Sequence, residues 1–285
     1  MKYWAKKFID LILYSNLWIG LCAMSMYFVT LLLLDQDLVF DPLAGLILSC
    51  TLVIYALHRL VGLSKVNDFL DVERYRVIAE YKSHIWIYAG LATFVGIWCF
   101  FLVPWRVRWS LIIPGILSLL YVLPVLGGNK KLRLRDYDWI KIYLIAFVWA
   151  YVTVFLPGIY FELEEPIHLG LLFVERALFI FAITLPFDIR DLTVDKHTDV
   201  RTIPARLGVK RSVWLGVGCL FLSGILGFFH LPVLDASLLM GHAVLTMVFV
   251  SLSGKTEHDY FFTGLMDGTM ILQFLGLWLP MVVLF

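Results

Sequence analysis

The sequence predicts an all-α polytopic membrane protein of about nine transmembrane helices, because it is strongly apolar and its apolar residues fall into long stretches. Hydrophobic residues make up 61% of the 285 residues, charged residues 16%, and the mean hydropathy is +0.87. This exceeds what a soluble core needs. About 20 apolar residues cross a bilayer, and such stretches lie at residues 11–34, 42–63, 85–103, 109–127, 139–160, 168–187, 212–229, 232–253 and 261–284. They leave no room for a separate soluble domain.

The basic residues predict how the chain is oriented. Of the 23 Lys and Arg residues, 19 fall in the N-terminus, in three loops and at Lys255, and these segments are expected to share the cytoplasmic side. The loops are 64–84, 128–141 and 188–211. The opposite loops are mainly acidic. We therefore expect an inner-membrane protein with its N-terminus inside and, with nine spans, its C-terminus outside.

A secretory signal at the start of the chain and a metal or disulfide role for the cysteines are both weaker interpretations of the sequence. The first apolar run is too long for a secretory signal, and no small-residue cleavage site follows it. The four cysteines all fall in apolar stretches without metal-ligand spacing, so we expect them to be packed core residues: Cys22, Cys50, Cys99 and Cys219.

The two longest polar insertions, 64–84 and 188–211, follow the second and sixth spans. The chain can thus be divided into two four-helix halves plus a final helix, within a single domain over residues 1–285. Since both insertions are expected on the cytoplasmic side, function is expected there too.

The most informative segment is FDIRDLTVDKHTDVRTIPARLG, residues 187–208. Its four acids are spaced three, four and four residues apart, so a helix that continued past the membrane edge would place them on one face: Asp188, Asp191, Asp195 and Asp199. Like charges at this spacing repel. The stripe therefore predicts a bound cation.

Oxygen ligands of this kind suit Mg2+, which commonly bridges one or two carboxylates to substrate phosphates. Basic residues that crowd the same loop, including Arg201, are suited to phosphate oxygens. The alternative is a solvated loop whose acids and bases pair with each other. That alternative explains the basic residues but not the acids on one face.

Other segments on the same side offer weaker candidates. Asn67, Asp68 and Asp71 form an oxygen-rich group that also arises by chance in polar loops. In YALHRL, Arg59 either binds an anionic group or snorkels to the interface beside a packed His58. The basic patch after Tyr121 suits phosphates or topology equally well and holds Lys130, Lys131, Arg133 and Arg135. Asp267 is expected to face the protein interior, without an assigned role.

Residues 187–208 resemble the second aspartate motif of the UbiA superfamily of intramembrane prenyltransferases, roughly (N/D)IxDxxxDxxxGxxTLPxxLG. The matching positions are Asp188, Ile189, Asp191, Asp195, Thr202, Pro204, Leu207 and Gly208, with Ile203 for leucine and Asp199 for glycine. The expected architecture is also similar to that of this family over the whole chain, since it has about nine helices and long inner loops after the second and sixth spans.

The resemblance implies a UbiA-like helical bundle that uses Mg2+ to transfer a polyprenyl group from its diphosphate to a lipophilic acceptor. In such enzymes two aspartate motifs hold the metal, which neutralises charge on the leaving diphosphate. Asp188, Asp191 and Asp195 would be metal ligands here, with Asp191 and Asp195 central to catalysis. Asn67, Asp68 and Asp71 would form a second metal set. Arg201, Lys130, Lys131 and Arg59 would contact the diphosphate, and no nucleic acid is expected as a partner.

The first aspartate motif departs from the family pattern NDxxDxxxD followed by Arg-Pro. Asn67, Asp68 and Asp71 fit, but Tyr75 replaces the last aspartate and no Arg-Pro follows. YALHRL, at residues 55–60, lies closer to the expected position. If YALHRL is the equivalent segment, the first metal-binding motif is absent.

Two further functions are therefore considered. One is a non-catalytic relative that binds a prenyl lipid or assists membrane assembly, as expected from a lost first motif. The other is a CDP-alcohol phosphotransferase, which the missing DGxxAR signature opposes.

Overall fold

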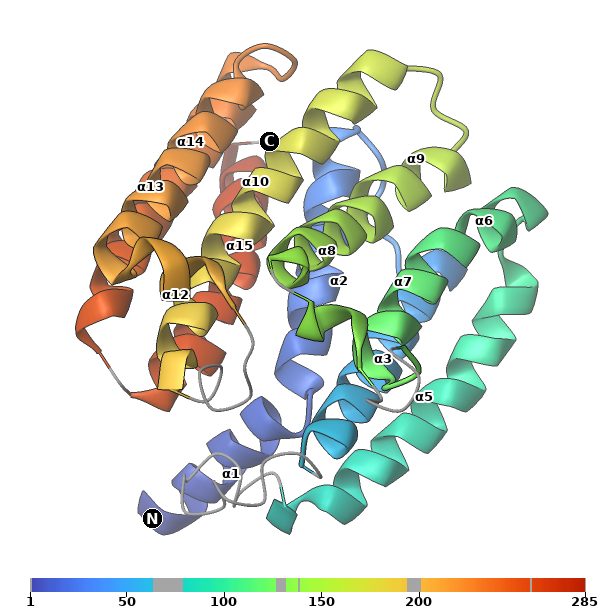
Figure 1. Cartoon of the computed structure of the whole chain (residues 1–285). Helices are drawn as coiled ribbons and strands as arrows, with labels where there is room; N and C mark the ends of the chain where they lie inside the picture. Colours follow the sequence, from blue (N-terminus) through green and yellow to red (C-terminus); the bar gives the residue numbers. More distant parts are fainter. Residues whose placement is uncertain are drawn as a thin grey trace.

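The computed structural model is a bundle of helices and describes residues 2–63, 79–126, 132–137, 139–193, 201–256 and 258–284. Figure 1 shows the long helices packed side by side, with α1 across one end of the bundle. The α-helices are α1 (Lys2–Tyr14), α2 (Leu17–Leu33), α3 (Pro42–Leu63), α5 (Lys82–Leu102), α6 (Trp105–Ser110), α7 (Ile112–Val122), α8 (Ile140–Ala150), α9 (Leu156–Tyr160), α10 (Pro166–Arg190), α12 (Ile203–Leu207), α13 (Val209–Gly227), α14 (Val233–Leu252) and α15 (Asp267–Leu284).

Shorter helical turns complete the described part of the chain, in which no strand is formed. Two are 3-10 turns, η3 (Leu134–Asp136) and η5 (Ser253–Lys255), and two are π-helices, η4 (Tyr151–Phe155) and η6 (Phe261–Met266). The prediction of an all-α membrane protein is confirmed.

Among the described residues, seven helices are long and apolar enough to cross a membrane, and α1 with α2 adds an eighth if that bent pair is one span. The pair bends by 59°, where Asn16 adopts a left-handed conformation with a φ of 74°. The predicted number of nine is not confirmed. The 109–127 stretch is divided between α6 and α7, and α7, at 11 residues, extends only about 17 Å against a hydrocarbon core of about 30 Å.

α2 lies at the centre of the packing because it is buried on two sides. One side, with Cys22 and Met26, belongs to the apolar cluster of α8, α10 and α13 to α15. The other side, with Met24 and Tyr27, packs on α3 and belongs to an apolar cluster that also includes Cys99 of α5. Large apolar side chains on α5, such as Phe94 and Trp98, instead face outward, as lipid-facing surfaces do.

Of the four cysteines, Cys22 and Cys99 are buried as predicted. Cys50 differs from the prediction, since it is exposed and lines a cavity described below. All four are free thiols.

Two adjacent charges in the middle of α10 are buried. Arg176 is fully buried and donates hydrogen bonds to the Met26 carbonyl at 2.9 Å and to Thr153 Oγ1 at 3.0 Å. Glu175 accepts one from Ser223 at 3.3 Å. These bonds join α10 to α2, η4 and α13, so the charges tie four elements together.

We predict that Arg176→Met destabilises the protein by about 3–5 kcal/mol, because it leaves Glu175 buried without a neighbouring cation and frees the acceptors on α2 and η4. The thermal unfolding midpoint in detergent measures this. The matched control is Arg106→Met, which removes an exposed ion pair with Glu162 and is expected to cost at most about 1 kcal/mol. Equal midpoints for the two variants would contradict the prediction.

Candidate active site

The end of α10 places two of the predicted acids beside each other. α10 continues through Pro186 to Arg190, and Asp191 forms its C-cap. Asp188 and Asp191 are three residues apart and line the same cavity. The predicted stripe is thus formed at its first two positions, while Asp195 and Asp199 lie outside the described residues.

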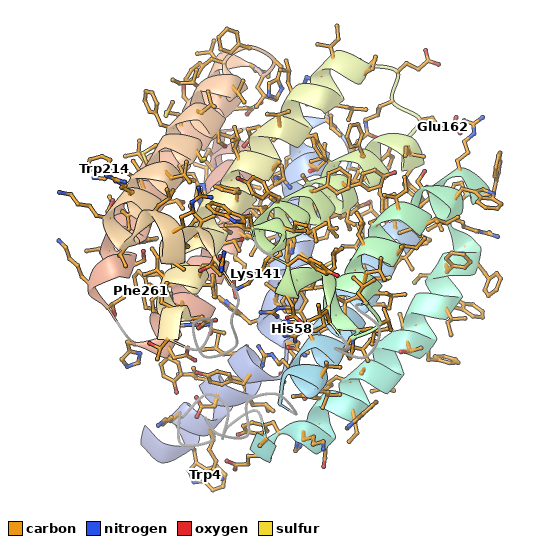
Figure 2. The ribbon with its side chains drawn as sticks, viewed as in Figure 1. Trp4, His58, Lys141, Glu162, Trp214 and Phe261 are labelled. Carbon is orange, nitrogen blue, oxygen red and sulfur yellow. The ribbon has the colours of Figure 1, made fainter. Side chains whose placement is uncertain are left out.

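The cavity has a volume of about 300 Å³ and lies between α3, α7, α8, α10 and α15. Its acidic lining residues are Asp188, Asp191 and Asp267, and its basic ones are His58, Arg135, Lys141 and Arg190. Most of the remaining wall is apolar or aromatic, including Tyr55, Tyr121, Trp149, Ile54, Leu117 and Val148. Figure 2 shows Lys141 and His58 inside the bundle, with Glu162 at the opposite end from Trp4.

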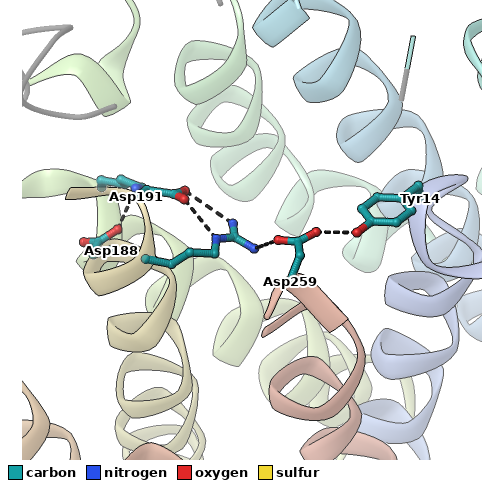
Figure 3. A network of polar contacts seen from close by, with 6 residues as sticks. Tyr14, Asp188, Asp191 and Asp259 are labelled. Carbon is teal, nitrogen blue, oxygen red and sulfur yellow. Dashed lines mark hydrogen bonds and ion pairs between the residues drawn. The ribbon is translucent and has the colours of Figure 1, made fainter. Parts of the chain in front are cut away.

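Each of the two α10 acids is already paired with a cation. Lys141, one residue into α8, donates to Asp188 at 2.5 Å, and Asp188 is only 2% exposed. Arg190 pairs with Asp191 at 2.9 Å and also with Asp259 at 2.8 Å. Figure 3 shows this chain of contacts, in which Asp191 and Asp259 share one guanidinium group.

The same network extends to α1. Tyr14 donates a hydrogen bond to Asp259, and Tyr260 donates one to Asp10. Arg59, at the end of α3, donates to the carbonyls of Leu13, at 3.1 Å, and of Tyr14. Arg59 therefore holds the end of α1 here and is not one of the residues that line the cavity.

The end of α3 presents no acid to the cavity among its described residues. It contributes Tyr55 and His58. The His58 ring stacks on Tyr121 with 5.9 Å between centroids, and Arg135 contacts His58 and covers the Tyr121 ring at 5.3 Å. This is the position at which YALHRL was expected to replace the first motif. Asn67, Asp68 and Asp71 lie outside the described residues.

The basic patch after Tyr121 separates into different environments. Arg133 pairs with Asp136 at 2.7 Å, whereas Arg135 lines the cavity. Lys130 and Lys131 lie outside the described residues. Arg201 lines a small pocket of about 10 Å³ together with Lys141 and Asp188, so it lies next to that ion pair.

The sequence analysis did not predict that Lys141 pairs with Asp188 or that Asp259 pairs with Arg190. It used Lys141 only as a topology signal. Lys141 did carry a signal, because it lies within the apolar run IKIYLIAFVWA, where an ionisable residue usually has a partner. For Asp259, which precedes the last span in an ordinary polar turn, no such signal exists.

The donor set fits Mg2+ in part. Mg2+ is commonly held by one or two carboxylates together with waters and phosphate oxygens, and Asp188 and Asp191 supply such a pair. Within the described ranges, no group of three or more His, Cys, Asp or Glu side chains is close enough to hold a metal ion. A metal at this pair would compete with Lys141 and Arg190 for the carboxylates.

No known protein-family model matches the sequence, and no curated protein sequence matches it. Solved structures do resemble it. A UbiA homologue from Archaeoglobus fulgidus bound to DMAPP and Mg2+ superposes with a TM-score of 0.62 at 11% identity, over 94% of this chain and 98% of that one. The same homologue bound to GPP and Mg2+ gives 0.61 at 12% identity, over 94% and 99%.

A digeranylgeranylglyceryl phosphate synthase superposes with a TM-score of 0.56 at 14% identity, over 98% of this chain and 97% of that one. These similarities extend over nearly the whole of each chain, and at such low identity they establish the architecture. The chain therefore shares its fold with these UbiA homologue structures and with this synthase.

Proposed function

We propose that this protein is an intramembrane prenyltransferase that moves a polyprenyl group from its diphosphate to a lipophilic acceptor with the help of Mg2+. The observation that carries the proposal is the pair Asp188 and Asp191 on the wall of a largely apolar cavity inside the bundle. The structural neighbours bound to GPP or DMAPP with Mg2+ support it at the level of the fold.

The charged residues suggest how the donor is received. Lys141 and Arg190 neutralise the two acids before any substrate is present. Asp188 and Asp191 would hold Mg2+, and Lys141 and Arg190, which now pair with these acids, would be placed to donate to diphosphate oxygens. Arg201, which lines a small pocket with Lys141 and Asp188, would be a further donor. The metal supplies charge neutralisation on the leaving diphosphate.

The apolar wall has a separate task in this proposal. An allylic carbocation reacts with water unless water is excluded. Ile54, Leu117 and Val148 line the cavity beyond its charged groups, so the prenyl chain and the cation would lie against hydrocarbon and aromatic surfaces. The orientation expected from the basic loops would open this site toward the cytoplasm.

A non-catalytic relative that binds a prenyl lipid is the second candidate. The observation that favours it is the end of α3, which offers Tyr55 and His58 to the cavity where the family motif would offer acids. The two functions differ in whether pyrophosphate is released.

We expect Asp191→Asn to lower Mg2+-dependent pyrophosphate release by roughly 100-fold or more, because it removes a charged ligand on which the leaving group depends. The measurement uses purified protein in lipid nanodiscs with a series of prenyl diphosphates and candidate acceptors. Asp37→Asn, which changes an exposed acid between α2 and α3, is the control and should behave as the wild type. Equal release by wild type and Asp191→Asn would remove Asp191 from the site, and no release from the wild type would favour the lipid-binding function.

Lys141→Gln tests the metal site without relying on turnover. The variant leaves Asp188 buried without its cation, so its unfolding midpoint should fall, and added Mg2+ should raise that midpoint more than it does in the wild type. Lys210→Gln, at an exposed lysine on α13, serves as the control and should match the wild type. If Mg2+ stabilises the Lys141 variant no more than the wild type, Asp188 is not a metal ligand.

A further inference from the structure

The small pocket beside the Lys141–Asp188 ion pair has no occupant in the function proposed above. It lies between the start of α8, the end of α10 and residues 201–203, because all three segments line it. Its volume of about 10 Å³ is close to the space that one water molecule needs. The pocket therefore has room for a ligand of one heavy atom.

Two contacts hold the walls of this pocket together. The backbone N–H of Trp139 donates a hydrogen bond to the Arg201 carbonyl at 3.4 Å. The Arg206 guanidinium covers the Trp139 ring, with 4.7 Å to the ring centroid. Since Arg206 belongs to α12 and Trp139 is the N-cap of α8, these contacts fix the two helices against each other. The pocket is thus built into the fold at this junction.

Thr202 lines the pocket and carries a buried hydroxyl that needs a partner. The residue is 2% exposed, and its Oγ1 makes no hydrogen bond within the described part of the chain. Thr202 is also the N-cap of α12, where a threonine side chain ordinarily accepts from a first-turn N–H, but it makes no such bond here. Because a buried hydroxyl without a partner is costly, Thr202 indicates that a ligand completes the site.

The other polar groups of the pocket limit what this ligand is. Asp188 and Lys141 are paired at 2.5 Å, so their opposite charges together offer little attraction to an ion of either sign. A carboxylate accepts hydrogen bonds and an ammonium group donates them. A ligand that contacts both must therefore donate and accept, and with one heavy atom that ligand is water.

We propose that this pocket holds one ordered water molecule, which bridges the Thr202 hydroxyl to the Lys141–Asp188 pair, and that Thr202 positions Asp188 through this water. Thr202 is then a positioning residue, since it acts on the candidate metal ligand without touching the metal. The positioning role rests on the proposed function, because it concerns Mg2+ at Asp188. The water site itself does not depend on that function.

A crystal structure of the wild type, at a resolution that shows ordered water, tests the site directly. We expect density for one water within hydrogen-bond distance of Thr202 Oγ1 and of Asp188 or Lys141. A pocket without water, or a Thr202 hydroxyl that bonds only to protein atoms, would overturn the proposal.

Thr202→Val tests the same site in solution, because valine has nearly the shape of threonine and cannot bind the water. The thermal unfolding midpoint in detergent should fall by about 2–4 °C. The control is Thr93→Val, which removes an exposed hydroxyl that donates to the Ala89 carbonyl of its own helix and should leave the midpoint unchanged. An unchanged or higher midpoint for Thr202→Val would show that the hydroxyl has no partner in the wild type, and the proposal would fail.

The Mg2+ concentration that gives half-maximal binding of geranyl diphosphate in nanodiscs tests the positioning role. Thr202→Val should raise this concentration about tenfold, as the loss of a group that orients a metal ligand does. Thr202→Ser keeps the hydroxyl and should stay close to the wild type, as should Thr93→Val. Equal losses in the valine and serine variants would indicate a packing effect and would exclude the positioning role.

Failure of the proposed function can be told apart from failure of this inference. If the wild type does not bind geranyl diphosphate with Mg2+, the proposed donor site is wrong and the positioning role falls with it. The crystal structure and the unfolding midpoint still decide the water site in that case, and the wild-type structure decides it even if Thr202→Val does not fold. If the wild type binds and Thr202→Val binds at the same Mg2+ concentration, only the positioning role is excluded.

Discussion

The buried ion pair between Lys141 and Asp188 sets the conditions for the rest of the candidate site. Burying a carboxylate inside a protein is costly unless a cation pairs with it. Asp188 is only 2% exposed, and Lys141 supplies that cation from the first turn of α8. The pair therefore fixes α8 against the end of α10. The same requirement explains why Asp191 is not left alone but is paired with Arg190.

Arg190 extends this constraint to the ends of the chain. Because its guanidinium is shared by Asp191 and Asp259, and because Asp259 also accepts from Tyr14, the end of α10 is connected to the turn before η6 and to α1. Arg59 adds a link from α3 to the same end of α1. Segments far apart in the sequence thus meet around Asp191 and Asp259. A substitution of either acid is expected to alter the packing of α1.

The composition and the length of the apolar runs were enough to predict the fold class, since a bilayer-spanning helix is a local feature of the sequence. The spacing of the acids likewise predicted that Asp188 and Asp191 would share a face. Lys141, Asp259 and the cavity position of Cys50 were missed because they depend on which helices pack together, and one sequence does not contain that information. The predicted number of spans was not confirmed, because the 109–127 stretch is interrupted between α6 and α7.

The composition of the cavity wall bears on how the proposed function could work if YALHRL occupies the place of the first aspartate motif. In the described residues the α10 side supplies acids, whereas the α3 side supplies Tyr55 and His58, with Arg135 against that histidine. A diphosphate carries enough negative charge to be held by cations directly as well as through a metal. A metal bound on one side only, faced by basic and aromatic groups on the other, would hold the same ligand with fewer carboxylates. If the protein is the prenyltransferase proposed above, the end of α3 would alter how a diphosphate is shared between metal and protein without by itself removing the diphosphate from the site.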